Sequence, residues 1–355
     1  MDFDDSRLED PASLADADDL LRTLASCGSR IRREAADLVD ASGSPGPALA
    51  GFDAGRRPRG VIALGAEARL LRAVVEPICP VPFVAWTLAG LPGWVGPLDL
   101  VVVLASGGSD PDLVLAVREA VRRGCALILA SPPGSPIEEF AGSRSTLLVP
   151  ATTGDPLASA VVVLAVLHEL GIGPLVRPES VAVSADRAAE ACSPHRDLAL
   201  NSAKDLALGV AEAQPLVWGG TVLAARAARR VSEGLRQASG RAALAADAAA
   251  LYPVIDLAEV RDPFADPFDE AAAAPRPVLV VFDDRSDSDR ARRERGELQS
   301  IADQRQVRVC EVSALGVDEL SSDVDRYVSL LQQGLFASAY LGIGLGRDAT
   351  TEWGA

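Results

Sequence analysis

The chain has 355 residues, of which 48% are apolar and 24% charged, a balance that excludes a wholly disordered protein. Its formal net charge of −16 disfavours binding to nucleic-acid phosphates or to an anionic membrane surface as a main function. No apolar run reaches the roughly 18 residues that span a bilayer, and the acidic start MDFDDSRLED is unlike the basic start of a signal peptide. We therefore expect a cytoplasmic protein that has no nucleic-acid partner and no membrane partner.

The residue types that hold metals and form disulfides are sparse and scattered. Five cysteines occur singly, with no Cys-x-x-Cys pair, and the odd count argues against a disulfide framework. Cys79, Cys125 and Cys310 lie in or beside apolar runs and are expected to be small buried side chains. The two histidines, His168 and His195, cannot build a histidine-rich zinc site. Walker and GxGxxG patterns are also absent, so we expect no metal and no cofactor.

The first half of the chain alternates between predicted strands and predicted helices. Apolar residues recur at helical spacing over residues 11–40, and glycine and proline in residues 41–60 end that stretch. Strands are then predicted at residues 60–64, 81–86, 98–104, 125–130 and 146–149, and helices at 67–76, 111–123 and 155–170. Strands as apolar as LVVVLA are buried on both faces, which is typical of a parallel sheet covered by helices.

The second half repeats this plan. A connector helix is predicted within NSAKDLALGVAEA. Strands are predicted at residues 215–219, near 253–257, 277–284 and 307–312, and helices at 221–237, 288–304 and 317–345. The chain is therefore expected to have an α/β fold with a helical leader at residues 1–40, a first domain at 41–180 and a second domain at 181–355.

The segment LDLVVVLASGGSDPDLVLAVREAVRRG carries the clearest pattern for ligand binding. A buried strand ends at Leu104, residues 105–109 are small, and Asp110 and Pro111 are suited to begin the next helix. Ligands of parallel sheets bind where strands end and helix N-termini point outward. Glycine lets backbone amides approach an anion closely, and serine hydroxyls can donate to it. The pattern indicates either a phosphate-binding loop or simply a tight strand-to-helix turn.

The loop ASGGSDPDL resembles the Ser/Thr-rich sugar-phosphate loop of sugar isomerase (SIS) domains. Four further stretches resemble, in chain order, parts of the tandem-SIS bifunctional phosphoglucose/phosphomannose isomerases. They are DPASLADADDLLRTLASCGSRIRREAADL, NSAKDLALGVAEAQPLVWGG, VLVVFDDRSDSDRARRERGEL and VDRYVSLLQQGLFASAYLGIGLGRD. The resemblance covers nearly the whole chain. It implies two tandem SIS-type, flavodoxin-like, three-layer domains with parallel sheets, a phosphorylated sugar as ligand, and a homodimer.

The resemblance assigns sugar-phosphate binding to five residues: Ser106, Gly107, Gly108, Ser109 and, at the turn after the first strand, Gly65. The chain departs from the family pattern at three places around them. Leu104 stands where the loop usually offers an earlier serine, Glu67 intrudes where the first turn usually reads Gly-Gly-Ser, and Asp110 adds a negative charge.

The catalytic positions of the family are largely missing. The segment that should hold the base, in an Asn-Glu-Asn-type pattern, reads QASGR, with Ala238 in the centre. The segment that should hold the ring-opening histidine reads Leu-Ala-Glu, so Glu259 is the only surviving carboxylate and a weak catalytic candidate. Leu157 stands where the family has an arginine, and the family's C-terminal lysine has no counterpart, since Lys204 is the only lysine in the chain.

Three functions are therefore considered. The first is a sugar-phosphate-binding, isomerase-like protein with weak or no isomerase activity. The second is an active aldose–ketose isomerase of glucose 6-phosphate or mannose 6-phosphate, in which Glu259 or Asp256 serves as a substitute base. The third is a structural or interaction protein that binds no ligand and uses the loop only to turn the chain.

Overall fold

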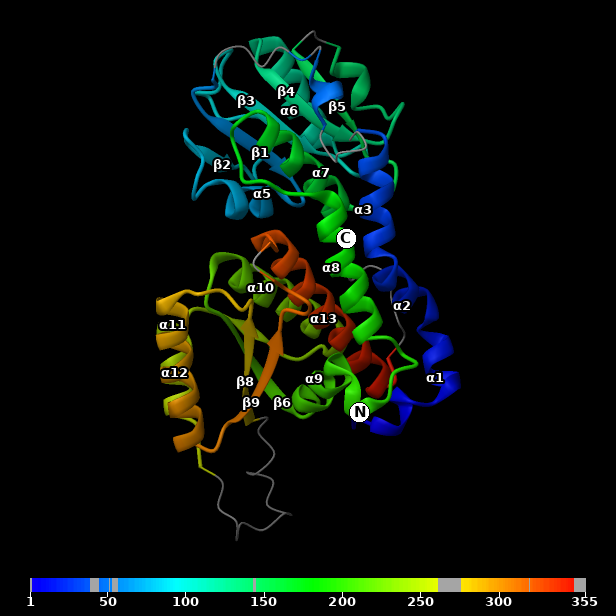
Figure 1. Cartoon of the computed structure of the whole chain (residues 1–355), viewed down its shortest axis with the longest axis vertical. Coiled ribbons are helices and arrows are strands. Elements are labelled where there is room, and N and C mark those ends of the chain that lie inside the picture. The colour runs from blue at the N-terminus through cyan, green and yellow to red at the C-terminus, as the bar shows by residue number, and fades with distance from the viewer. Residues whose placement is uncertain are drawn as a thin grey trace. The chain divides into compact units, whose positions relative to one another are not determined.

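A computed structural model describes residues 2–38, 45–50, 52, 57–142, 145–260, 276–318 and 320–347. The chain forms two compact units, each built on one sheet (Figure 1). The first-sheet unit consists of residues 27–183. The second-sheet unit consists of residues 2–26 together with the chain from residue 184 onward. The expected leader at residues 1–40 thus contributes to both units.

The first-sheet unit contains a five-stranded parallel sheet in the order β2-β1-β3-β4-β5. Its strands are β1 (Val61–Gly65), β2 (Phe83–Ala85), β3 (Leu100–Leu104), β4 (Ala126–Ser131) and β5 (Thr146–Pro150). Its helices are α3 (Cys27–Ala36), α4 (Gly46–Leu49), α5 (Ala68–Val75), α6 (Pro111–Arg123) and α7 (Pro156–Glu169), and α8 (Pro178–Ala191) crosses the division between the units. The strand order is that of flavodoxin-like folds.

Helices cover both faces of this sheet because its strands are apolar on both sides. On one face, Ala116, Val117 and Ala120 of α6 join Val101 and Val103 of β3 in one buried cluster. Helices α5 and α7 pack on the opposite face, and α7 is apolar all round, as a fully buried helix must be. The result is the expected three-layer arrangement of helix, sheet and helix.

The second-sheet unit contains a four-stranded parallel sheet in the order β7-β6-β8-β9. Its strands are β6 (Ala213–Gly219), β7 (Leu244–Ala245), β8 (Arg276–Asp283) and β9 (Arg308–Ser313). Its helices are α1 (Pro11–Asp16), α2 (Asp18–Ala25), α9 (Ser202–Val210), α10 (Val222–Ser239), α11 (Ala248–Asp256), α12 (Asp289–Gln304) and α13 (Asp323–Gly344). Figure 1 shows α11 and α12 on one side of this sheet and α9 and α13 on the other. The two sheets confirm the predicted fold class.

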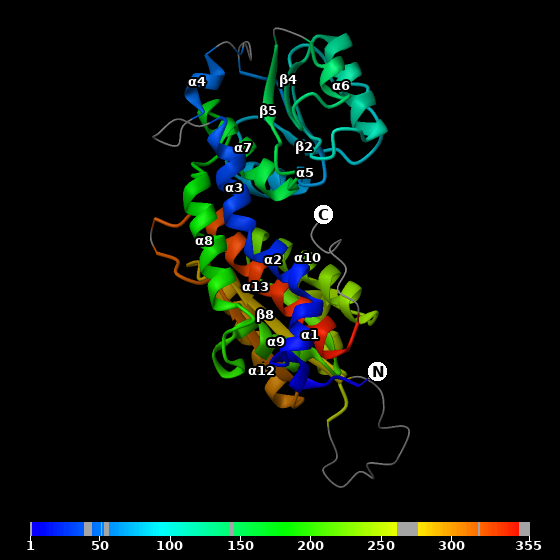
Figure 2. The same cartoon turned by 90° about the vertical axis from the view of Figure 1, so that its right-hand side faces the viewer.

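The N-terminal segment is part of the second-sheet unit because it closes the end of α13. The Asp4 amide donates to the Gly344 carbonyl at 2.9 Å, and the Arg7 Nε donates to the Ile343 carbonyl at 2.8 Å. These contacts satisfy carbonyls that the end of a helix leaves without partners. In Figure 2, α1 and α2 lie beside α13, and α2 contacts α13 directly.

One predicted strand, near residues 253–257, is wrong, because this stretch is part of α11. Asp247 caps the helix by accepting from the Ala250 amide at 2.9 Å. The alanines that follow are strong helix formers, and Leu251 and Ile255, four residues apart, are buried on one face. Apolar residues at that spacing are compatible with either a helix or a short strand. Here the Asp247 cap and the alanines favour the helix. The short strand β7 takes the predicted strand's place in the sheet.

Three helical predictions need smaller corrections. The helical stretch predicted at residues 11–40 consists, over residues 11–36, of three helices with breaks at Ala17 and Ser26, and residues 39–40 lie outside the described residues. Helix α8 was not predicted from the sequence. Helix α13 begins at Asp323 rather than at residue 317, because Ser322 and Asp325 form a capping box there.

Among the described residues, none of the helices is both long enough and apolar enough to cross a membrane, and no cluster of three metal-ligating side chains occurs. Cys125 and Cys310 are buried as expected, whereas Cys79 is half-buried. Burial raises the pKa of the Cys125 and Cys310 thiols, so neither is a ready thiolate nucleophile near neutral pH.

Candidate functional site

The loop between β3 and α6 presents free backbone amides at the carboxyl edge of the first sheet. Gly108 has a φ of +69° and donates to the Ala105 carbonyl at 2.8 Å, which folds the loop into a tight turn. Among the described residues, the amides of Ser106, Gly107 and Ser109 find no acceptor. Three unpaired N–H groups in one turn are the donors that a bound anion requires.

The N-terminus of α6 follows directly but is already occupied by its own cap. The Asp110 carboxylate accepts from the Asp112 amide at 2.8 Å and from the Leu113 amide at 3.4 Å. An anion at this edge would therefore use the amides of the loop rather than those of the helix. It would still gain from the helix dipole, and it would be opposed by the negative charge of Asp110.

The loop after β4 packs directly against the Gly108 turn. A Cβ atom added at Gly108 would lie 2.6 Å from the Cβ of Ser135, so only glycine allows the two loops to meet this closely. The Glu138 carboxylate holds the second loop in shape, because it accepts from the Ser131 hydroxyl at 2.9 Å and from the Gly134 amide at 2.8 Å. The edge is thus built from two loops, whereas the sequence pattern pointed to one.

Three polar atoms at this edge are buried without a hydrogen-bond partner among the described residues: the hydroxyl oxygens of Ser106 and Ser135 and the indole nitrogen of Trp86. Trp86 follows β2 and packs against the core cluster that includes Ala105 and Ile137. A buried donor without a partner costs about 1–3 kcal/mol. A hydroxyl can turn about its side-chain bond to meet an incoming oxygen, which would remove this cost.

Ser135 and Trp86 were not identified from the sequence. The signal for Ser135 was present, because SPPGS begins at Ser131, the last residue of the apolar strand β4, and ligands of parallel sheets bind at the carboxyl ends of strands. For Trp86, a single aromatic residue after a three-residue strand offers no pattern that separates a ligand contact from ordinary packing.

Gly65 lies at the same edge, at the end of β1. It pairs with Leu104 in the register of β1 and β3, and its φ is +102°. A Cβ atom added there would lie 2.1 Å from the Leu104 carbonyl oxygen. Gly65 therefore allows β1 and β3 to end side by side, and its part in ligand binding stays a prediction, as do those of Ser106, Gly107, Gly108 and Ser109.

Glu259 lies at the other end of its own sheet. It is exposed three residues after the end of α11, on the segment that leads toward the start of β8. This is the amino edge of the second sheet, whereas ligands of parallel sheets bind at the carboxyl edge. Asp256, the alternative base, is paired with Arg305 at 2.7 Å. Ala238 is fully buried in α10, and its methyl group has no atom that can move a proton.

The carboxyl edge of the second sheet is closed by an acidic side chain. The Thr221 hydroxyl at the start of α10 donates to the Asp284 carboxylate, which also accepts from the Ser286 amide at 3.1 Å. Arg326 fixes the same loop by donating to the backbone carbonyls of Asp284 at 2.9 Å and Arg285 at 3.1 Å. A carboxylate in this place repels a phosphate, so the two sheets differ in what their edges can bind.

Comparison with known proteins agrees with this architecture. Residues 199–352 match the family model of the bacterial phospho-glucose isomerase C-terminal SIS domain. A search of curated proteins finds no match for the chain.

Two solved structures illustrate the similarity of fold. The C-terminal domain of glucosamine-fructose-6-phosphate aminotransferase from Francisella tularensis aligns with a TM-score of 0.63 at 12% identity, over 93% of this chain and 97% of that one. Tagatose-6-phosphate ketose/aldose isomerase from Escherichia coli aligns with a TM-score of 0.63 at 15% identity, over 97% of this chain and 95% of that one. Residues 199–352 therefore match the bacterial phospho-glucose isomerase C-terminal SIS domain family, and nearly the whole chain shares the fold of these two structures.

Proposed function

We propose that this chain binds a phosphorylated sugar at the carboxyl edge of its first sheet and lacks the groups that isomerise it. The observation that carries the proposal is the set of unpaired donors there, namely three loop amides and the hydroxyls of Ser106 and Ser135. Phosphate is the common ligand that accepts from several such donors at once. The fold adds support, because both similar proteins described above are named for a sugar phosphate.

The absence of isomerase activity is argued from chemistry. Aldose–ketose isomerisation requires a base that moves a proton between C1 and C2 and an acid or base that opens the ring, and such groups contribute about 10²–10⁴-fold each. The positions that match the family's base and arginine are Ala238 and Leu157, neither of which can carry a proton or a charge. Glu259 is the remaining carboxylate of the pattern, and its place at the amino edge of the second sheet does not favour a catalytic role.

Calorimetric titration with hexose and pentose phosphates tests the binding, with inorganic phosphate and sulfate as minimal anions. We expect one equivalent per chain, because the negative charge of the Asp284 carboxylate lies at the carboxyl edge of the second sheet and repels a phosphate. Replacing Ser106 and Ser135 together by alanine should weaken binding by about tenfold to a hundredfold, the range for lost hydrogen bonds to a charged group.

Thr221→Ala is the matched control, because it removes a hydroxyl from the corresponding edge of the second sheet and should leave the affinity unchanged. If neither sugar phosphates nor inorganic anions bind, the chain is better described by the ligand-free structural function. A homodimer and a cytoplasmic location stay predictions from the sequence.

A further inference from the structure

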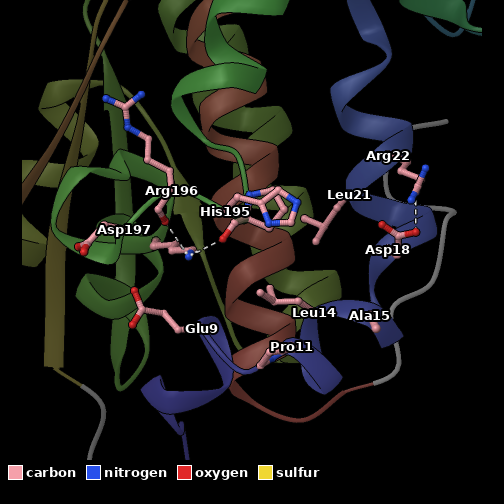
Figure 3. Close-up of a pocket in the computed structure, with 12 residues that line it drawn as sticks. Glu9, Pro11, Leu14, Ala15, Asp18, Leu21, Arg22, His195, Arg196 and Asp197 are labelled. Carbon is pink, nitrogen blue, oxygen red and sulfur yellow. Dashed lines mark hydrogen bonds and ion pairs between the residues drawn. The ribbon is translucent and has the colours of Figure 1, made fainter.

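A pocket lies in the second-sheet unit, away from the residues that the proposed function uses. It has a volume of about 580 Å³ and is lined by α1, α2, residues 194–197 and the start of α9 (Figure 3). This volume is within the range of small-molecule sites. Its walls combine apolar side chains with charged ones, so the state of each charge determines what the pocket can bind.

The buried charge at this pocket is Lys204. Its side chain is 1% exposed, and its ammonium group donates to the carbonyls of Pro194 and Arg196, both at 3.0 Å. The ammonium also lies 5.6 Å from the centre of the Tyr340 ring. No carboxylate among the described residues lies within ion-pair distance of it. Burial lowers the pKa of Lys204, while the nearby negative charges of Glu9 and Asp197 act against that shift without forming an ion pair.

The acidic side chains around the pocket each have a partner already. Asp18 is paired with Arg22 at 2.5 Å, and Glu9 and Asp197 each accept from a backbone amide, at 3.0 and 2.9 Å. Figure 3 also shows the Asp197 side chain directed away from the apolar wall. Of the charged groups that line the pocket, only the Lys204 ammonium is buried, so it gains the most from an opposite charge inside the pocket. The three carboxylates nearby favour an occupant with a single negative charge over a doubly charged phosphate ester.

The apolar wall consists of Pro11, Leu14 and Leu21, and the His195 imidazole is directed toward Leu21 (Figure 3). Among the described residues, that imidazole makes no hydrogen bond. The wall can cover a hydrocarbon or aromatic skeleton, while the imidazole can donate to a carboxylate oxygen. Lys204 fixes the loop that carries His195 by donating to the carbonyls on either side of it. The imidazole and the ammonium group are therefore positioned before a ligand binds.

From this arrangement we propose that the pocket binds a small organic carboxylate whose apolar body lies against Leu14 and Leu21 and whose charge lies near Lys204 and His195. The site is separate from the sugar-phosphate edge, which belongs to the first-sheet unit, and does not depend on the proposed function.

Nuclear magnetic resonance of the full chain offers a direct test, because the chain has only two histidines. Benzoate is the probe, and benzamide is its uncharged counterpart of the same shape. Benzoate should shift the imidazole signals of His195 to saturation, with a dissociation constant on the order of 1 mM, and leave those of His168 unchanged. Benzamide should bind about tenfold more weakly, because it lacks the charge. Saturating inorganic phosphate should not displace benzoate.

Two variants test whether the positive charge of Lys204 is responsible for benzoate binding. Lys204→Met should weaken benzoate binding by about tenfold or more, whereas Arg290→Ala, which removes an exposed positive charge on α12, should not change it. If Lys204→Met does not fold, the comparison of benzoate with benzamide on the unaltered chain still tests whether the pocket prefers a negatively charged ligand. Equal binding of the two probes, no saturable shift of His195, or displacement of benzoate by phosphate would overturn the proposal.

Discussion

Replacing Gly108 by alanine is expected to reduce sugar-phosphate binding by at least about tenfold while the protein stays folded. The new Cβ would lie 2.6 Å from the Ser135 Cβ, and the φ of +69° is one that alanine adopts only at a cost of about 1–2 kcal/mol. Both effects push the β3–α6 loop away from the loop after β4. The amides and hydroxyls of the edge would then no longer converge on one anion, and calorimetric titration would record the loss.

Gly93→Ala is the control for this variant. Gly93 lies in the same unit, has no positive φ, and has nothing within 4 Å of an added Cβ. It should bind the sugar phosphate with unchanged affinity and melt at an unchanged temperature. If Gly108→Ala also binds normally, the close contact between the two loops is not needed for the site, and the account of a two-loop edge is wrong.

A large effect on stability is expected at Gly334, in the middle of α13. A Cβ atom there would lie 2.2 Å from Val231 Cγ2 and 3.0 Å from Val231 Cβ, on the facing helix α10. Valine in a helix has one preferred side-chain rotamer, so it cannot turn away. Gly334→Ala should therefore lower the free energy of unfolding by about 1–3 kcal/mol, the usual cost of an overpacked core. Urea denaturation measures this change.

Gly296→Ala makes the same substitution in α12, where an added Cβ meets nothing within 4 Å. Here alanine should raise the free energy of unfolding by about 0.5–1 kcal/mol, because glycine is the weaker helix former. The two variants should thus shift stability in opposite directions. Equal shifts, or stabilisation by Gly334→Ala, would show that α10 and α13 are not packed as closely as described.

The fold could be predicted well where local signals agree. Helix α6 begins and ends where the sequence predicted, because Asp110 caps its start and Gly124, with a φ of +70°, ends it. The strand before it was equally clear, since five consecutive buried apolar residues have few other arrangements. Prediction failed at residues 253–257, where a strand and a helix explain the same apolar spacing and only the surrounding packing chooses between them.

The site could be predicted only in part, because its second half comes from a distant segment. The small residues at 105–109, followed by Asp110, predict a turn that can hold an anion. In the structure, Gly108 forms that turn through its positive φ and its hydrogen bond to the Ala105 carbonyl. The contact with Ser135 depends on the pairing of β3 with β4, which brings two strand ends together. The closed edge of the second sheet was not foreseen either, because the hydrogen bond from Thr221 to Asp284 joins residues 63 positions apart.

The most direct test of the central claim is phosphorus nuclear magnetic resonance of fructose 6-phosphate mixed with the protein, because one spectrum reports both binding and conversion. We expect the substrate signal to broaden with the unaltered chain and to sharpen again with the Ser106→Ala/Ser135→Ala variant, and no signal of glucose 6-phosphate or mannose 6-phosphate to grow in. Growth of either product signal that depends on Glu259, or an unbroadened substrate signal at high protein concentration, would contradict the account.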